Sequence, residues 1–201
     1  MRRRVLVLDM GNVLVYWDPR HLYRKLIPDP ESMEHFLATV CTPGWNHRQD
    51  MGRPFREAIR ELQEHHPEHV ELISAWWDRW DEMVPTAVPG MPDLVTKLRS
   101  AGTPVYVLTN CSTETYPRVV ERFPFVAAVD GVLVSGEHGV AKPDPAIYAL
   151  AARRFGFEPG ECVFVDDMPV NVEAARSAGW EGVVFSTADS LESELVRLGL
   201  L

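Results

Sequence analysis

The sequence predicts an α/β fold, in which a parallel sheet carries helices on both faces and a helical segment is inserted after the first strand. Two observations predict it. In the second half of the chain, short apolar runs alternate with segments of helical spacing, as in sheets whose parallel strands are joined by helices. From about residue 17 to residue 84, apolar residues recur at helical spacing and no convincing strand is present. We therefore expect one interruption of the sheet, directly after its first strand.

Each expected strand is a short apolar run. Residues 5–8 read Val-Leu-Val-Leu, and such a continuous run suits a strand that is buried on both faces. The other strands are expected over residues 105–108, 132–134, 162–165 and 182–185. Between them, helices are expected to start near residues 92, 113, 145 and 169, three of which are prolines, a residue favoured in the first helical turn.

The inserted segment is expected to contain about four helices. Its apolar residues recur at helical spacing over 21–26, 31–40, 55–64 and 68–83. Prolines and glycines separate these stretches. The polar stretch 45–52, which ends in Gly52, is expected to be a loop between two of the helices.

Composition and charge exclude several classes of function. The chain has 201 residues and a formal net charge of −9, so no basic field exists to hold nucleic acid or an anionic membrane. It has no apolar run of the roughly 18 residues that a membrane span needs. The three cysteines, Cys41, Cys111 and Cys162, are odd in number and widely spaced, which indicates reduced thiols in a cytoplasmic protein. The sequence carries no signal of the oligomeric state.

Polar side chains stand at the ends of three expected strands. Asp9 follows the first strand, Thr109 and Asn110 follow the second, and Asp166 and Asp167 follow the fourth. The carboxyl ends of parallel strands meet at one edge of a sheet, where open α/β sheets bind their ligands. The loop formed by residues 139–145 is rich in Gly and Pro, and its one cationic side chain is Lys142. We expect these groups to form one site.

The chemistry of this set fits phosphoryl transfer. Three carboxylates cannot remain ionised together without a cation, and ligands that are all oxygen select a hard ion such as Mg²⁺. Asp9 could then attack phosphorus and form an aspartyl-phosphate. Thr109 and Asn110 would donate hydrogen bonds to phosphate oxygens, and Lys142 would offset the developing negative charge. Because the chain is acidic overall, such a phosphate site has to be local and metal-assisted.

Four segments resemble the motifs of the haloacid dehalogenase (HAD) superfamily, and they occur in the family's order. They are Val-Leu-Asp-Met-Gly-Asn-Val at 7–13, Val-Leu-Thr-Asn at 107–110, Lys-Pro-Asp-Pro at 142–145 and Phe-Val-Asp-Asp-Met-Pro-Val-Asn at 164–171. The resemblance covers essentially the whole chain. It implies a Rossmann-like core formed by residues 1–16 and 86–201, and a helical cap domain formed by residues 17–85.

The resemblance also implies roles for the residues near the first and last motifs. Asp9 would be the nucleophile. Mg²⁺ would be bound by Asp9, by the backbone carbonyl of Gly11 and by Asp167, with Asp166 beside or on the metal. Asn171 would orient the loop that carries the two aspartates.

The resemblance implies that Thr109, Asn110 and Lys142 bind the phosphate group. It also implies a catalytic role for Lys142. Gly11 and Asn12 are small residues after the nucleophile, so their backbone can approach the substrate closely. A cap segment such as 45–52 would dip toward the active site and select the substrate.

The sequence departs from the family pattern at Gly11. Most phosphatases of the superfamily have a second aspartate there, which acts as general acid and base. The Gly-Asn pair is similar to the subgroup that contains bacterial α-glucose-1-phosphate phosphatase, which implies activity without that aspartate. The proton donor is left open by the sequence, and Asp18, His47 and Asp50 are the candidates on the cap side.

The expected function is therefore a Mg²⁺-dependent phosphatase that hydrolyses a small phosphorylated metabolite, with sugar phosphates among the candidates. Two alternatives remain at this point. One is a degenerate HAD domain that binds a phosphorylated ligand without turnover, a reading that Gly11 keeps open. The other is a 2-haloacid dehalogenase, which needs no metal and would leave Asp166 and Asp167 buried near Asp9 without a counter-ion.

Overall fold

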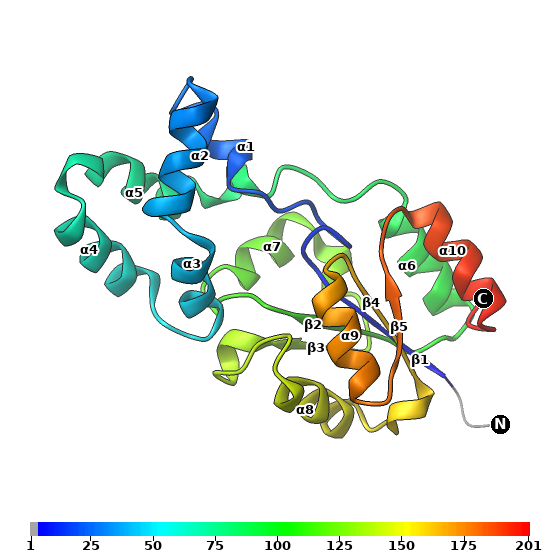
Figure 1. The fold of residues 1–201 in the computed structure, drawn as a ribbon. Coiled ribbons are helices and arrows are strands. Elements are labelled where there is room, and N and C mark those ends of the chain that lie inside the picture. The colour runs from blue at the N-terminus through cyan, green and yellow to red at the C-terminus, as the bar shows by residue number, and fades with distance from the viewer. Residues whose placement is uncertain (1–3) are drawn as a thin grey trace.

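Five parallel strands form the sheet in the order β3-β2-β1-β4-β5 in the computed structural model, which describes residues 4–201 (Figure 1). The strands are β1 (Val5–Leu8), β2 (Val105–Thr109), β3 (Gly131–Val134), β4 (Cys162–Asp166) and β5 (Glu181–Val184). Each lies within one residue of its expected bounds. The central strand is β1, and its Leu8 is in register with Val107 of β2 and Val165 of β4. This register brings the ends of the three motif-bearing strands together at one edge.

Helices cover both faces of the sheet, as the fold class predicts. Alternate residues of the buried strands point to opposite faces. Leu6 and Leu8 join the core under one set of helices, and Val5 and Val7 join the core under the other. The first set comprises α6 (Met91–Ser100), α7 (Tyr116–Arg122) and α10 (Ala188–Arg197), and the second comprises α8 (Pro145–Phe155) and α9 (Pro169–Ser177).

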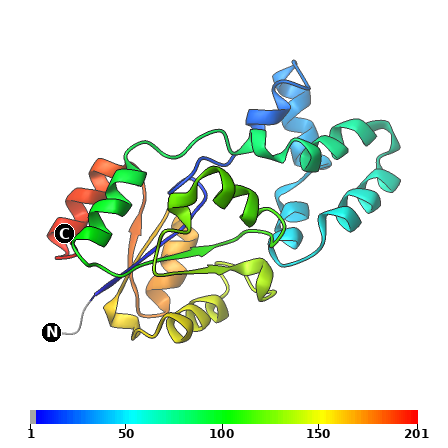
Figure 2. The ribbon, with the colours of Figure 1, turned by 180° about the vertical axis from the view of Figure 1, so that it is seen from behind.

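The regular elements of the insert between β1 and α6 are all helices. In Figure 2 it lies at the end of the molecule opposite the chain termini, in the blue and cyan part of the ribbon. Its elements are α1 (Arg20–Tyr23), α2 (Pro30–Thr39), α3 (Pro43–Asp50), α4 (Phe55–His65), η1 (Pro67–His69), α5 (Val70–Asp78) and η2 (Trp80–Met83). The insert is built around an aromatic cluster, in which the Trp45 ring meets the rings of Trp76 and Phe55 edge to face at 5.2 and 6.3 Å between centroids.

The expectation of a loop over residues 45–52 was wrong, because most of this stretch belongs to α3. The Thr42 side chain caps the helix by accepting a hydrogen bond from the Trp45 N–H at 3.0 Å. Pro43 occupies the first turn, where a proline is favoured. Gly52, with φ of +98°, follows the helix end. The Pro-Gly pair at 43–44 therefore starts a helix here instead of marking a loop.

The expected helix over 68–83 is interrupted at Arg79, whose backbone leaves the helical region with φ of −121° and ψ of 22°. Arg118 of α7 forms hydrogen bonds with the chain on both sides of this break. Its guanidinium donates hydrogen bonds to the Trp77 carbonyl at 3.1 Å and to the Asp81 carboxylate at 2.8 Å. Contacts between segments so distant in sequence are not encoded in local periodicity.

Among residues 4–201, no helix combines the length and the apolar character that crossing a membrane requires. The thiols of Cys41, Cys111 and Cys162 are free and buried. The first three residues of the expected core lie outside the part of the chain that the structure describes.

Candidate active site

A cavity of about 380 Å³ lies between the strand ends and the insert, and all residues predicted to bind metal or phosphate, except Asp166, line it. From the core come Asp9, Gly11, Asn12, Thr109, Asn110, Lys142 and Asp167. From the insert come Asn46, His47 and Asp50 of α3, together with Phe55 and Trp80. The ends of β1 and β2, the segment after β4 and the loop that carries Lys142 therefore line one cavity.

Lys142 is the centre of this site. Its Nζ lies 2.7 Å from Asp9 Oδ1 and 2.7 Å from Asp166 Oδ2, and the residue is only 2% exposed. Burial opposes the charge on Lys142, but the carboxylates of Asp9 and Asp166 hold its pKa above the usual value, so it stays an ammonium ion. Burial also raises the pKa of Asp9 to about 7; Lys142 works against this rise and the charge of Asp166 adds to it.

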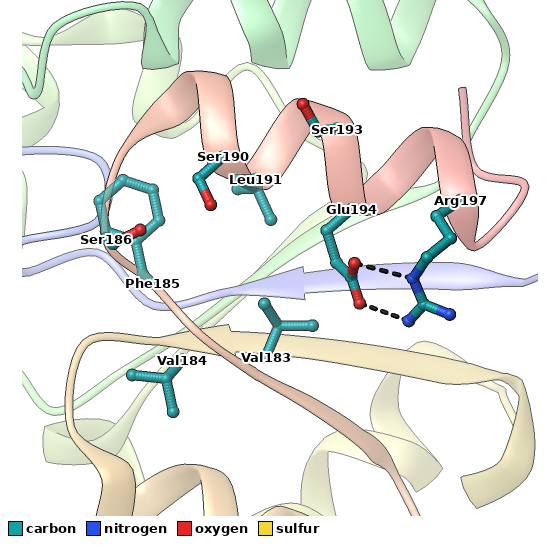
Figure 3. A pocket seen from close by; sticks show the side chains of 9 residues that line it. All are labelled: Val183, Val184, Phe185, Ser186, Ser190, Leu191, Ser193, Glu194 and Arg197. Carbon is teal, nitrogen blue, oxygen red and sulfur yellow. Dashed lines mark hydrogen bonds and ion pairs between the residues drawn. The ribbon is translucent and has the colours of Figure 1, made fainter.

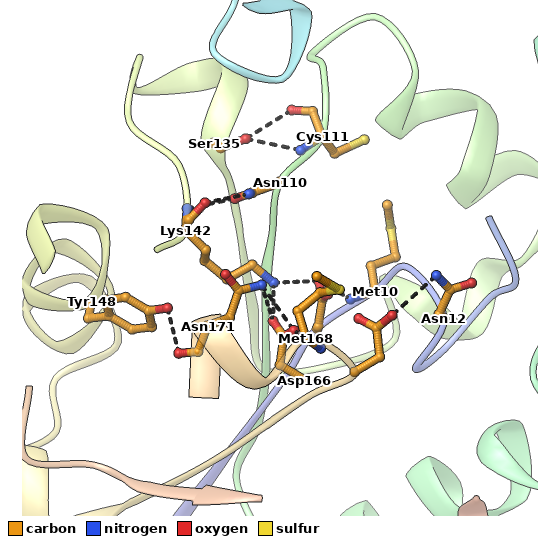
Figure 4. Close-up of polar contacts among 12 residues, drawn as sticks. Met10, Asn12, Asn110, Cys111, Ser135, Lys142, Tyr148, Asp166, Met168 and Asn171 are labelled. Carbon is orange, nitrogen blue, oxygen red and sulfur yellow. Dashed lines mark hydrogen bonds and ion pairs between the residues drawn. The ribbon is translucent and has the colours of Figure 1, made fainter. Parts of the chain in front are cut away.

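Asp166 is fully buried behind Lys142, and donors occupy both of its oxygens (Figure 4). Its Oδ1 accepts the Met168 N–H at 2.8 Å, and the Asn171 amide donates to Oδ1 at 3.0 Å and to Oδ2 at 3.1 Å. Asn171 is held in turn by Tyr148, whose hydroxyl donates to its main-chain carbonyl at 2.8 Å. The prediction that Asn171 orients this loop matches these contacts, and Asp166 anchors Lys142.

Asn12 connects the first and last motifs. It is the one residue other than glycine with a positive φ, +55°, in residues 4–201, a conformation that asparagine tolerates better than most residues. Its side-chain Nδ2 donates to Asp167 Oδ2 at 3.3 Å, and its Oδ1 accepts the Trp17 N–H at 3.1 Å. Asn12 thus holds Asp167 in the cavity wall and fixes the start of the insert.

The three aspartates fit a hard divalent cation. One carboxylate oxygen from each of Asp9, Asp166 and Asp167 lies within 4.8 Å of the others, and all the donors are oxygen, as Mg²⁺ prefers. Both hydrogen bonds of the Asp9 carboxylate, from the Met10 N–H and from Lys142, go to Oδ1. No donor of residues 4–201 contacts its Oδ2. Burial and the charge of Asp166 raise the pKa of Asp167, so a cation would relieve a real repulsion.

Asn110 has a role that sequence reasoning missed. Its Nδ2 donates to the Lys142 carbonyl and its Oδ1 accepts the Lys142 N–H, each at 2.8 Å (Figure 4). The side-chain amide therefore clamps the main chain of Lys142 on both sides. Donation to phosphate oxygens by the side chain of Asn110, as predicted, would compete with this clamp, whereas its backbone N–H is not bound by it.

Ser135 is a second residue that the sequence did not reveal. It follows the edge strand β3 and is fully buried. Its hydroxyl accepts the Cys111 N–H at 3.0 Å and donates to the main-chain carbonyl of Asp50. It therefore joins the insert to the segment after β2, and no motif in the sequence marks this long-range contact.

The structure separates the three candidate proton donors. Asp50 and His47 line the cavity that contains Asp9, whereas Asp18 lines a neighbouring cavity, where it pairs with Arg20 at 3.3 Å. Trp45, expected to help select the substrate, is buried in the aromatic cluster of the insert and is absent from the residues that line the Asp9 cavity.

Another cavity lies between β5 and α10 (Figure 3). Its walls are apolar residues, serines and one ion pair, in which the Arg197 Nε donates to Glu194 Oε2 at 2.9 Å. It holds no cluster of carboxylates or other groups suited to catalysis. The site beside Asp9 is therefore the candidate active site.

Curated relatives of this chain include several phosphatases. Over 111 residues the chain is 32% identical to flavin mononucleotide hydrolase 1 of Arabidopsis thaliana, a match that covers 55% of this chain and 45% of the relative. Over 157 residues it is 29% identical to the phosphoserine phosphatase of Thermus thermophilus, covering 76% of this chain and 63% of the relative. The chain thus spans less than two thirds of the length of either protein.

Solved structures share the fold. The HAD family enzyme bt-2542 of Bacteroides thetaiotaomicron superposes with a TM-score of 0.77 at 21% identity, covering 96% of this chain and 98% of that one. The same enzyme in complex with magnesium and inorganic phosphate gives a TM-score of 0.72 at 21% identity, covering 92% of this chain and 95% of that one. The family model of the haloacid dehalogenase-like hydrolases matches residues 4–179. This chain therefore belongs to the haloacid dehalogenase-like hydrolase family.

Proposed function

We propose that this hydrolase is a Mg²⁺-dependent phosphomonoesterase that acts on a small phosphorylated metabolite through an aspartyl-phosphate on Asp9. The observation that carries the proposal is the pairing of the buried Lys142 ammonium with both Asp9 and Asp166, next to Asp167, in one cavity. This arrangement offers a nucleophile, a fixed positive charge and oxygen ligands for a hard cation. The phosphatases among the relatives, and the similar enzyme solved with magnesium and phosphate, support the same reading.

Each residue of the site has a role in this reaction. Asp9 Oδ2 attacks phosphorus, and the bond from phosphorus to the leaving oxygen breaks. Lys142 keeps Asp9 oriented and offsets negative charge on the phosphoryl oxygens. Asp9, Asp167 and the Gly11 carbonyl would hold Mg²⁺, with Asp166 beside it; when bound, the ion supplies charge neutralisation at the phosphate. Water then cleaves the aspartyl-phosphate and releases inorganic phosphate.

The phosphate-binding groups in this proposal are Thr109, Asn110, Lys142, Gly11 and Asn12. All five line the cavity. Thr109 is 1% exposed and lines the cavity, and its hydroxyl would donate to a phosphate oxygen. For Asn110, the clamp on Lys142 assigns phosphate donation to its backbone N–H.

We take residues 1–16 and 86–201 as the catalytic core and residues 17–85 as a cap domain. Its α3 contributes Asn46, His47 and Asp50 to the wall opposite the core. A cavity of about 380 Å³ lies at the small end of the range typical for sites that bind small ligands. A compact metabolite such as a sugar phosphate would fit it.

The substrate can be specified further from the chemistry at Gly11. Without an aspartate at that position, substrates whose leaving oxygen is already stabilised should react best. An anomeric hydroxyl is more acidic than a primary alcohol, because the ring oxygen withdraws electron density. Hexose 1-phosphates are therefore the preferred sugar substrates in this proposal, as in the α-glucose-1-phosphate phosphatase subgroup that the sequence resembles.

The test is a screen of phosphorylated metabolites with Mg²⁺ and with excess chelator, on the natural protein and on Asp9→Asn. We expect turnover that requires both Mg²⁺ and Asp9, with higher kcat/KM for glucose 1-phosphate than for glucose 6-phosphate. Binding of phosphorylated ligands without turnover would identify a degenerate domain. Halide release from a 2-haloacid in the presence of chelator would identify a dehalogenase, and either result would overturn the proposal.

A further inference from the structure

Cleavage of a phosphate ester expels an alkoxide unless a proton reaches the leaving oxygen. The residue two positions after Asp9 is Gly11, which has no side chain to give one. In the proposed reaction the phosphate binds at the strand ends, so the leaving group would occupy the part of the cavity away from Asp9 and Lys142. The wall opposite the strand ends is formed by the insert, and its titratable side chains in this cavity are His47 and Asp50.

Asp50 is held firmly at this wall. It is the last residue of α3, and its main-chain carbonyl accepts the hydrogen bond from Ser135 of the core. Its Oδ2 accepts a hydrogen bond from Asn46 Nδ2, one helical turn earlier, at 3.0 Å. No cation of residues 4–201 forms an ion pair with its carboxylate. Asp50 is thus fixed by the core through its backbone and carries an uncompensated carboxyl group into the cavity.

Across the cavity from the strand ends, Asp50 lies close to the segment that follows β2. The charges of both carboxylates contribute, after burial, to raising the pKa of the Cys111 thiol to about 12. Cys111 directly follows Thr109 and Asn110 in the chain, and its N–H is bonded to Ser135. The Ser135 hydroxyl also bonds to the Asp50 carbonyl, and this shared partner places Asp50 beside the phosphate-binding segment.

The surroundings of Asp50 favour its neutral, proton-carrying form. Burial raises the pKa of the Asp50 carboxyl to about 7. Its position at the carboxyl end of α3 works in the same direction, because the helix macrodipole disfavours negative charge there. A general acid works best when its pKa lies near the operating pH.

The other groups are less suited to this task. Lys142 is bonded to two carboxylates, and Asp167 belongs to the metal cluster. His47 lines the cavity but is exposed, and Asp18 is paired with Arg20 in the neighbouring cavity.

We propose that Asp50, supplied by the insert, is the general acid and base that takes the place of the residue missing at position 11. This inference rests on the proposed phosphatase function. In the first step the O–H of Asp50 gives its proton to the leaving oxygen as the P–O bond breaks and the bond from Asp9 to phosphorus forms. In the second step, the oxygen of a water molecule bonds to phosphorus while the Asp50 carboxylate accepts a proton from that water. Asp9 leaves as a carboxylate, and both residues return to their starting forms.

Two aryl esters of similar shape test this assignment, p-nitrophenyl phosphate and phenyl phosphate, assayed with Mg²⁺. Phenolate is a poorer leaving group than p-nitrophenolate and depends more on a proton. For Asp50→Asn we expect kcat/KM on phenyl phosphate to fall about 100-fold, at the lower end of general-acid effects, while p-nitrophenyl phosphate loses far less. The ratio kcat/KM reports the first step, so slow hydrolysis of the aspartyl-phosphate does not mask the effect.

Two variants serve as controls. Asp50→Glu keeps the acidic group and should recover part of the activity on phenyl phosphate. Asp18→Asn makes the same chemical change in the neighbouring cavity and should leave the ratio of the two substrates unchanged. Circular dichroism checks that each variant is folded.

The outcomes separate the two proposals. Equal losses of Asp50→Asn on both esters, or no loss on either, would overturn the acid role while the phosphatase function stands. The same would follow if Asp18→Asn or His47→Gln, and not Asp50→Asn, changed the ratio. Failure of the natural protein to hydrolyse either ester or any metabolite with Mg²⁺ would overturn the proposed function, and the role of Asp50 with it.

Discussion

The hydroxyl of Ser135 in the core donates a hydrogen bond to the main-chain carbonyl of Asp50 in the insert. The last carbonyls of a helix have no partner within the helix, and Ser135 supplies one at the end of α3. The same hydroxyl accepts the Cys111 N–H, so one buried oxygen connects β3, the segment after β2 and the insert. Three parts of the active site therefore share one hydrogen-bonding group.

Replacing Ser135 with alanine should destabilise the protein and displace Asp50. Both the Cys111 N–H and the Asp50 carbonyl would lose a buried partner, and such a loss costs about 1–3 kcal/mol in the free energy of unfolding. Urea denaturation followed by tryptophan fluorescence measures this cost. Ser193→Ala is the matched control, because Ser193 is exposed and its hydroxyl bonds only within α10. Equal stabilities of the two variants would contradict the bridging role of Ser135.

Lys142 should be far more important for stability than a surface lysine. Lys142→Met leaves the buried carboxylates of Asp9 and Asp166 without their partner, and losing one member of a buried ion pair costs about 3–5 kcal/mol. Lys97→Met is the control, since Lys97 pairs with Glu192 on the surface and such pairs contribute about 0–1 kcal/mol.

These stabilities are measured by denaturation with chelator and again with excess Mg²⁺. A bound cation neutralises Asp9 and Asp167, so Mg²⁺ should restore part of the stability that Lys142→Met loses. For Lys97→Met, the effect of Mg²⁺ on stability should be no larger than for the natural protein. A Lys142→Met protein as stable as the natural one in chelator would show that the two carboxylates are not dependent on this ammonium group.

The fold was predictable because its determinants are local. The apolar runs of the strands and the motif residues at their ends can be read from the sequence, and a parallel sheet then brings Asp9, Thr109 and Asp166 to one edge. The residues that support the site were not predictable in this way. Ser135 acts through a contact with a residue 85 positions away, and Asn110 through one 32 positions away.

The insert shows the same limit. Its helices were expected from periodicity, but α3 was missed because Pro43 and Gly44 look like loop residues. That error matters for function, since α3 directs Asp50 and His47 toward the core. The choice among Asp18, His47 and Asp50 as proton donor depends on which cavity each residue lines. Only the three-dimensional arrangement of insert and core decides that.

Asp50 should also make the stability of the protein depend on pH, independently of turnover. Its pKa is raised from 3.8 to about 7 by burial in the folded state. Between these values the folded protein holds a proton that the unfolded chain has lost, so the free energy of unfolding falls as the pH rises through this window. Above about pH 7 the cost of burying the ionised carboxylate is fully present.

Asp50→Asn removes this cost, because an amide stays neutral. The difference in Tm between the variant and the natural protein, measured in chelator, should therefore be small near about pH 4 and increasingly in favour of the variant up to about pH 8. Other charged or titratable groups in the cavity walls and on the segment packed against α3 are Asp9, His47, Cys111, Glu137, His138, Lys142 and Asp167. They are present in both proteins, so their own titration largely cancels in the difference. A Tm difference that does not change with pH would mean that Asp50 is ionised in the folded protein throughout this range, and a carboxylate of that kind has no proton to give to a leaving group.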